Sequence, residues 1–351
     1  MTNRLSNAKA LYIDENFIYL AKGYRVYRAD RNLKNLIFDG KLVDSKYSFL
    51  SHFSRLLNRL LRIEPSSMLI LENGDRLVSA KKGIFVAKKN SKKYIKTFPI
   101  PRGNKPLNIC LHPNGNLYFG EYILNGRYAN TERSEVNIYK SEDSGQTWSI
   151  CYTFPKNTIR HVHGIFYDKY TKKLWVTTGD RDNECIIAST SDDFKSLDII
   201  KQGAQKYRAV SLLFYKEHII YGTDTEHEKN YIYSIDRKTN KETPLVELQG
   251  SVLMATQNQN TKEASISTAV EPSTINHHPY AHIWFSKDGL EWKDIYSAKK
   301  DKWSAKYFQY GRITFPQNAI QNGTIIFSGH ALEEIDNKIV NLKNISTKEF
   351  A

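Results

Sequence analysis

Two histidines separated by one residue are the clearest candidates for chemistry in this chain. His161 and His163 lie in the segment Arg160-His161-Val162-His163-Gly164. Residues two apart in a β-strand point to the same face, so the two imidazoles are expected to lie together. Such a pair can bind a metal ion, act as general acid and base, or form a structural hydrogen-bonded pair. The sequence leaves these three interpretations open.

A tyrosine and an arginine add to this chemistry. Tyr207 and Arg208 are adjacent in the chain. Removal of a proton beside a carboxylate needs a base within hydrogen-bond reach and a cation over the carboxylate. Tyr207 and Arg208 beside the two imidazoles would supply both. The predicted catalytic residues are therefore His161, His163, Tyr207 and Arg208.

A repeated turn indicates the elements that carry these residues. In residues 141–148, Asp143 can bond the backbone that follows it, Gly145 can adopt a positive φ, and Trp148 can bury its ring. This Ser-x-Asp-x-Gly-x-Thr-Trp spacing resembles the Asp-box (BNR-repeat) hairpin of sialidase-like β-propellers. Residues 286–292 form a shorter copy of the turn, and residues 191–194 form a further one.

The spacing of the copies predicts the fold. Ser141 and Ser191 are 50 residues apart, and Ser191 and Ser286 are 95 apart, which fits one step and two steps of a single unit. A unit of about 50 residues with four short strands is typical of a propeller blade. We therefore expect an all-β, seven-bladed propeller of four-stranded antiparallel blades that forms one domain over residues 1–351.

In such a propeller, the loops that enter the first strand of each blade and leave the second gather on one face. Turns need Gly, Asn and Asp, but they do not need Arg, His or Tyr at these positions. The polar residues there are the predicted substrate-binding residues: Glu121, Arg127, Arg160, Asp180, Arg181, Glu184, Asp224, Glu271, His277, Tyr310, Arg312 and His330.

The paired histidines with Tyr and Arg around a seven-bladed channel also look like the propeller polysaccharide lyases that cut uronate-containing glycans. This resemblance implies β-elimination, with a Tyr or His as base and an Arg or a metal ion over the uronate carboxylate. Two other functions stay open. One is glycoside hydrolysis on a sialidase-like fold, for which carboxylates are available, and the other is non-catalytic binding of a glycan or a protein.

The remaining predictions concern ligands and partners. No residue is assigned as a metal ligand, although a divalent metal ion held by histidines stays open, with His277, His278 or His330 as a third imidazole. A net charge of +14 favours a polyanionic partner, here an acidic polysaccharide or oligosaccharide. No nucleic-acid-binding module is recognisable, so no nucleic acid is expected. The oligomeric state is not predicted.

One segment breaks the β pattern. Apolar residues at helical spacing, with arginines between them, predict an amphipathic helix at about residues 47–62, inserted between the first two blades. Its apolar face is expected to pack on the propeller. The alternative is a peripheral contact with an anionic membrane or a protein partner.

The cysteines and the hydropathy pattern bear on the compartment. Cys110, Cys151 and Cys185 show no disulfide or thiolate-zinc spacing, which suits a reducing environment. No apolar run approaches the length of a membrane span, and no signal-peptide pattern is recognised. A cytoplasmic location is therefore expected.

Overall fold

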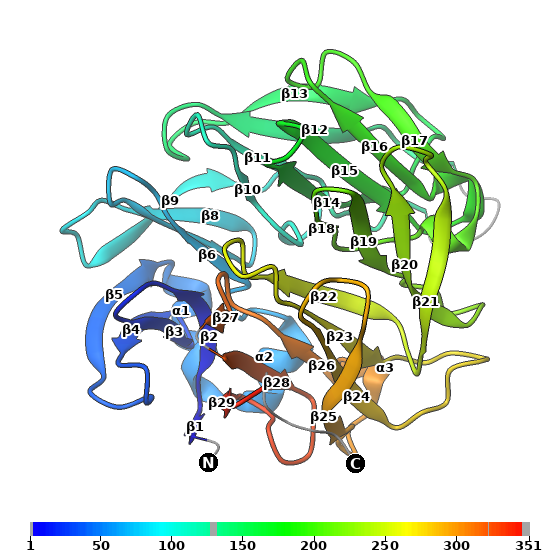
Figure 1. Cartoon of the computed structure of the whole chain (residues 1–351). Coiled ribbons are helices and arrows are strands. Elements are labelled where there is room, and N and C mark those ends of the chain that lie inside the picture. Colours follow the sequence, from blue (N-terminus) through cyan, green and yellow to red (C-terminus); the bar gives the residue numbers. More distant parts are fainter. Residues whose placement is uncertain (1–2, 127–131, 322, 346–351) are drawn as a thin grey trace.

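The computed structural model describes residues 3–126, 132–321 and 323–345 (Figure 1). Strands dominate these ranges, and successive groups of four strands form antiparallel sheets. The sheets are arranged around a centre, with sheets from the two ends of the chain side by side (Figure 1). This architecture is consistent with a β-propeller, as the sequence predicts.

The first two units share one sheet. Their outer strands, β5 and β9, pair in parallel, with Lys41 opposite Lys93, and this pairing joins the two units into eight strands. The first unit contains β2 (Lys9–Ile13), β3 (Ile18–Lys22), β4 (Arg25–Ala29) and β5 (Ile37–Val43). The second contains β6 (Ser67–Ile70), β7 (Arg76–Ala80), β8 (Gly83–Ala87) and β9 (Lys93–Pro99).

The next three units are separate four-stranded sheets. The third unit contains β10 (Cys110–Leu111), β11 (Leu117–Gly120), β12 (Val136–Ser141) and β13 (Ser149–Phe154). The fourth contains β14 (His161–Asp168), β15 (Lys173–Gly179), β16 (Ile186–Thr190) and β17 (Asp198–Gln202). The fifth contains β18 (Leu213–Phe214), β19 (His218–Gly222), β20 (Asn230–Asp236) and β21 (Glu242–Leu248).

The last two units are joined to each other and to the start of the chain. Strand β1 (Asn3–Ser6) pairs antiparallel with β29, where Leu5 lies opposite Ile339. Strand β23 pairs with β26 across the two units. The sixth unit contains β22 (Val252–Gln257), β23 (Ala264–Val270), β24 (Tyr280–Ser286) and β25 (Lys293–Lys299). The last contains β26 (Gly311–Thr314), β27 (Ile320–Gln321), β28 (Thr324–His330) and β29 (Lys338–Lys343).

The core lies between neighbouring sheets, because each sheet buries both of its faces. In the second unit, Val78 and Phe85 pack with residues of the first unit. The adjacent residues Leu77 and Ile84 point to the opposite face and pack with Leu117 of the third unit. This alternation explains why strands β7 and β8 are apolar on both faces.

The predicted Asp-containing turns share one hydrogen-bond pattern. The Asp143 carboxylate accepts the backbone N–H groups of Gln146 and Thr147, and the Trp148 indole donates to the carbonyl of Gly145 at 3.2 Å. In the copy at residues 286–292, the carboxylate of Asp288 accepts two backbone N–H groups, and the indole of Trp292 donates to a carbonyl at 2.9 Å.

The third copy of the turn begins at Thr190, one residue before the segment 191–194 that the sequence predicts. The Thr190 hydroxyl, not Ser191, accepts the N–H of Phe194, as the Ser141 hydroxyl accepts that of Gly145. Thr190 stands two residues before the aspartate that closes the turn, as Ser141 does. The neighbouring Ser191 had obscured the match.

The predicted helix at 47–62 is two helices, α1 (Ser45–Phe53) and α2 (Arg55–Leu61). Ser54 between them has an extended backbone, and its side chain accepts the N–H of Leu57, so it caps the second helix. The chain therefore turns inside the periodic segment. A short third helix, α3 (Ala305–Phe308), was not predicted. None of the described helices has the length and apolar character needed to cross a membrane.

The orientation of these helices differs from the prediction. Arg59 is 1% exposed, pairs with Asp301 and donates to the carbonyl of Phe308 at 2.7 Å. Phe49 and Phe53 are 70% and 73% exposed. The helices therefore dock largely through a charged face, because the surface beneath them carries carboxylates.

Candidate functional site

The paired histidines lie at the start of β14, beside the end of β15. His161 pairs with Gly179, and the register shifts between Val162 and Gly164, which gives His163 a bulged position. A side chain on Gly179 would place its Cβ 2.5 Å from the His163 ring. Glycine at this position therefore lets the imidazole lie against the end of β15.

Both histidines have a defined tautomer. The Nδ1 atom of His161 lies 3.1 Å from the carbonyl oxygen of Ile123, and that of His163 lies 3.0 Å from the carbonyl oxygen of Ala209. Because a carbonyl oxygen only accepts hydrogen bonds, each Nδ1 must donate. In the neutral rings, both Nε2 atoms then carry lone pairs.

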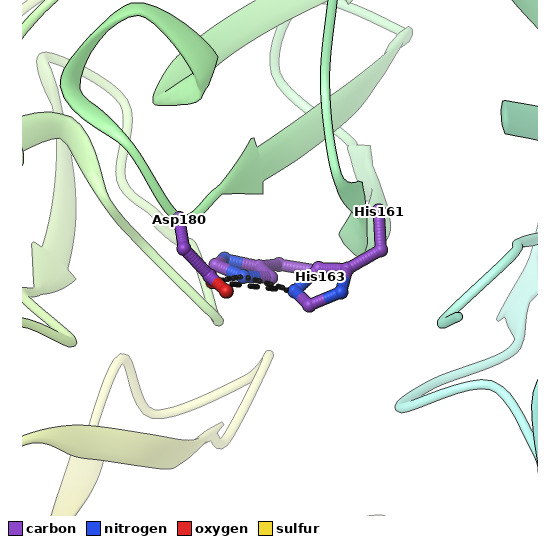
Figure 2. A group of neighbouring side chains, drawn as sticks. All are labelled: His161, His163 and Asp180. Carbon is purple, nitrogen blue, oxygen red and sulfur yellow. Dashed lines mark hydrogen bonds and ion pairs between the residues drawn. The ribbon is translucent and has the colours of Figure 1, made fainter. Parts of the chain in front are cut away.

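These lone pairs converge with a carboxylate (Figure 2). The two Nε2 atoms are 3.2 Å apart, and the Oδ1 atom of Asp180 lies 3.3 Å from that of His161 and 3.4 Å from that of His163. His161 and His163 are 3% and 2% exposed, so water is largely excluded from the rings. These three atoms are the geometric centre of the candidate site.

Arginines surround the same carboxylate. Arg160 bonds Asp180, and the Nη2 atom of Arg208 lies 3.2 Å from Asp180 Oδ1. Burial alone would raise the pKa of Asp180, but the neighbouring imidazoles and the charge of Arg208 hold it well below its usual range. Burial lowers the pKa of His163, which favours its neutral form.

Two further carboxyl groups face this cluster. Arg208 Nε lies 3.5 Å from Asp224 Oδ2. Burial raises the pKa of Asp224, and the nearby Glu271 and Asp180 raise it further. Burial also raises the pKa of Glu271. These two groups can therefore hold a proton at a higher pH than ordinary carboxyl groups.

Two tyrosines connect the parts of the site. The ring of Tyr122 lies 4.2 Å from that of His161, centroid to centroid. Tyr310 is close enough to Glu271, Tyr122 and Arg312 for their charges to affect its pKa, which burial raises above its usual value. Both hydroxyl groups therefore stay protonated near neutral pH and can donate hydrogen bonds.

The opposite side of the site is cationic. Lys9 donates to the carbonyl of Pro65 at 3.0 Å, Lys105 donates to that of Glu64, and Arg312 donates to the Gln309 side chain at 3.1 Å. In the described part of the chain, no carboxylate lies within ion-pair distance of these three cations. The Glu64 carboxylate is paired with Arg55 and lies 3.1 Å from His330.

Burial and mutual repulsion shift the pKa values of this cationic group. Burial, together with the charges of Lys9 and Arg312, lowers the pKa of Lys105 to about 7, although the charge of Glu64 acts in the opposite direction. Burial likewise lowers the pKa of Lys9 to about 8. The charge of Glu64 offsets these shifts only in part, and an anionic ligand would add further counter-charge.

Most of the predicted site residues meet, but Tyr207 does not join them. Its hydroxyl donates to Glu242 at 3.0 Å, and its ring faces Lys201 and Lys206. The prediction that Tyr207 lies beside the histidines is wrong, because a short helical turn at Gln205–Tyr207 directs its side chain toward the outer strand β21. The members of the observed cluster are Arg160, His161, His163, Asp180, Arg208, Asp224, Glu271, Tyr310 and Arg312.

Two predicted substrate-binding carboxylates support the protein structure instead. Glu121 is 2% exposed, pairs with Arg102 and accepts the backbone N–H of Asn137 at 2.8 Å. Glu184 is 1% exposed and lies 2.8 Å from Arg133. Because their oxygens are already bonded inside the protein, neither carboxylate is presented to a ligand.

The remaining predicted substrate-binding residues lie outside the cluster or outside the described part of the chain. His277 is exposed on the loop after β23, and His330 lies under the helices, bonded by Arg55 at 3.1 Å. Arg181 is half-buried, and its guanidinium lies 3.9 Å from Glu184. Arg127 lies outside the described residues.

Sequence reasoning missed Tyr122 and Lys9. Tyr122 is the second residue after β11, and the charged Glu121 beside it carried the prediction for this loop. Lys9 opens the first strand of the first unit. A search of the equivalent position in every unit would have found it.

Comparisons with known proteins show a similarity of fold only. No protein-family model and no curated protein sequence matches the chain. Among solved structures, the extracellular domain of the putative one component system BT4673 from B. thetaiotaomicron has a TM-score of 0.56 at 12% identity, over 96% of this chain and 38% of that chain. A chain of the mitotic checkpoint complex has a TM-score of 0.55 at 10% identity, over 97% and 90%.

A GH74 enzyme from Niastella koreensis is also similar, with a TM-score of 0.55 at 10% identity, over 82% of this chain and 45% of that chain. This chain therefore spans less than half the length of the first and third of these proteins. Likeness at such identities concerns architecture and carries no activity. Together with the sheet topology, it supports a β-propeller class for this chain.

Proposed function

We propose that the described units form a seven-bladed propeller of the Asp-box type. The pairing of β1 with β29 supports ring closure, because it joins the first strand of the chain to the last unit. The shared hydrogen bonds of the turns at Asp143, Asp192 and Asp288 support the Asp-box assignment. In such a ring, the candidate site lies where the inner strands of several blades meet.

We propose that this site acts on an acidic, uronate-containing glycan. The observation that carries the proposal is the cationic group of Lys9, Lys105 and Arg312, none of which has a described carboxylate partner. These cations can bind the uronate carboxylate. The charges of Arg312, Glu271 and Asp224 all affect the pKa of Tyr310, so its side chain lies near both the cations and the carboxyl groups.

The preferred reaction is β-elimination. The cations would stabilise the negative charge that develops on the uronate carboxylate when the neighbouring carbon loses its proton. That proton goes to a base on the histidine side, the electron pair forms a carbon–carbon double bond, and the glycosidic oxygen leaves. A protonated hydroxyl group, such as that of Tyr310, can give this oxygen its proton.

Hydrolysis is the second candidate because of Asp224 and Glu271. Glycoside hydrolysis uses one carboxyl group as acid and another as base or nucleophile. Burial raises the pKa of both groups, so one of them can retain a proton for the leaving oxygen. Hydrolysis creates a reducing end and no double bond, which makes the two reactions easy to separate.

The test is an assay of the purified protein with uronate-rich and neutral polysaccharides. Elimination predicts new ultraviolet absorbance from unsaturated uronate ends, and hydrolysis predicts reducing ends without it. Arg312→Gln should weaken turnover or binding of the acidic glycan at least tenfold, because one cation is lost. Tyr207→Phe is the matched control and should behave as the wild-type chain, because Tyr207 lies away from the cluster.

The same assay can reject the proposal. If no uronate-rich glycan is cleaved but one binds, and Arg312→Gln weakens that binding, the propeller is a non-catalytic glycan-binding protein. If none binds, or if Arg312→Gln and Tyr207→Phe behave alike, the acidic-glycan assignment is wrong.

A further inference from the structure

We propose that His161, His163 and Asp180 bind one divalent transition-metal ion, and that zinc fits best. This site would hold the ion whether or not a glycan binds, so the inference does not depend on the proposed function. Figure 2 shows the three side chains converging from the start of β14 and the end of β15. Each of the three residues offers one possible ligand atom, and these atoms all lie within 4.8 Å of one another.

The first argument is the direction of the lone pairs. Both Nδ1 atoms donate to backbone carbonyls, those of Ile123 and Ala209. The Nε2 atoms are therefore the ring positions left free for a metal ion, and they face each other at 3.2 Å with a carboxylate oxygen beside them. Three electron-rich atoms at this spacing repel one another unless a positive centre lies between them.

The second argument is the spacing itself. A tetrahedral zinc ion with bonds of about 2.0–2.1 Å keeps its ligand atoms about 3.3–3.4 Å apart. The distances among the two Nε2 atoms and Asp180 Oδ1 are 3.2, 3.3 and 3.4 Å. All three edges thus agree with one tetrahedral face, and the fourth ligand position stays open for water or a substrate oxygen.

The third argument is the support behind the ligands. Histidine ligands of metal ions usually donate their other N–H to a carbonyl or carboxylate, which fixes the ring. His161 and His163 both do this, and Arg160 and Arg208 hold the Asp180 carboxylate in place. Two imidazoles and one carboxylate are a recognised ligand set for zinc and for other divalent first-row ions.

The competing explanation is a proton shared between the two rings. A shared proton would also separate the lone pairs, but an N–H···N hydrogen bond involves only two of the three atoms. The positive charge of such a pair would also attract the Asp180 carboxylate, so direct metal titration decides between the two: a shared proton predicts no stoichiometric Zn²⁺ binding.

Metal binding by the full chain tests the proposal without any glycan. After treatment with a chelator, the protein should bind one Zn²⁺ per chain in isothermal titration calorimetry. Co²⁺ should bind at the same site and give the intense visible absorption of four-coordinate cobalt. Zn²⁺ should also raise the midpoint of thermal unfolding, because it binds the folded state.

The variants identify the ligands. His163→Ala should weaken Zn²⁺ binding at least a hundredfold and abolish both the cobalt spectrum and the thermal shift. Gly179→Ala keeps every ligand but places a Cβ against the His163 ring, so it should weaken binding roughly ten- to a hundredfold. His227→Gln is the control, because this exposed histidine lies outside the site. Circular dichroism checks that each variant folds.

Two outcomes would overturn the inference. One is the absence of stoichiometric Zn²⁺ or Co²⁺ binding by the wild-type chain. The other is equal binding by folded Gly179→Ala, His163→Ala and His227→Gln proteins, which would place the ion elsewhere. In either case the glycan assay would be unaffected, so the two proposals fail separately.

Discussion

At the scale of single residues, this site is unusual because charges of both signs are buried side by side. Asp180 is balanced by Arg160 and Arg208, whereas Lys9 and Lys105 donate only to backbone carbonyls. An uncompensated buried cation lowers the stability of the folded protein, and such costs concentrate where a ligand binds. Binding of an anionic ligand would therefore explain why the buried cations of this site are retained.

The cost of burying Lys105 predicts a pH dependence. Its pKa falls from 10.5 to about 7 on folding. Between these pH values the unfolded chain binds this proton and the folded chain does not, so the free energy of unfolding decreases as the pH falls through this window. Lys105→Met removes this contribution. Its stability relative to wild type should rise as the pH falls from 10 to 7, as measured by urea unfolding.

The matched control for this prediction is Lys89→Met, which removes an exposed lysine. Its stability relative to wild type should not change over the same pH range. If the difference in stability between Lys105→Met and wild type is also independent of pH, Lys105 does not have a lowered pKa in the folded protein.

At the scale of secondary structure elements, features that repeat along the sequence could be predicted from it, but contacts between distant segments could not. The repeated turns revealed the four-stranded units, because Asp and Gly at fixed spacing act locally. The two histidines lie together, as predicted, because side-chain alternation along a strand is also a local property. The position of Tyr207 depends on a short helical turn, and that of His330 on an inserted helix, so neither follows from strand period. Asp180 was predicted as a substrate ligand, and only the three-dimensional structure shows it between the imidazoles.

The helix insertion shows the same limit. Its hydrophobic spacing predicted helices correctly but gave the wrong docking face, because the sequence does not reveal which surface lies beneath them. That surface contains Asp301, Asp336 and Glu64. Arg55 and Arg59 pair with these carboxylates, and Phe49 remains exposed. Charge thus decides the orientation of α2 more than its hydrophobic pattern does.

This orientation predicts a large effect of Arg59. Arg59→Met should lower the free energy of unfolding by about 3 kcal/mol, because it removes the buried ion pair with Asp301 and the donor to the carbonyl of Phe308. Lys300 still pairs with Asp301 in this variant. Arg62→Met at the exposed end of α2 should change it by less than about 0.5 kcal/mol. Urea unfolding followed by tryptophan fluorescence measures both. Similar stabilities for the two variants would mean that the ion pair does not hold the helices.

At the scale of the whole molecule, the two ends of the chain meet. Strand β1 is the edge strand of the last unit, and β2, which follows it, opens the first unit. This pairing joins the two ends of the chain, whereas the described strands of the third, fourth and fifth units form no pairs with those of their neighbours. The site draws on both ends, since Lys9 comes from the first unit and Arg312 from the last.

Removal of β1 should therefore affect more than the edge that it covers. Deletion of residues 1–6 removes the pairing of Leu5 with Ile339 and exposes β29. We expect a loss on the order of 3 kcal/mol from the lost hydrogen bonds and apolar burial. If β1 closes a ring, amide exchange should increase in both β29 and β2. Arg4→Ala removes only an exposed ion pair and should change neither. Faster exchange confined to β29 would instead mean that β1 merely covers an edge, and that the first and last units are held together by the contacts between their faces.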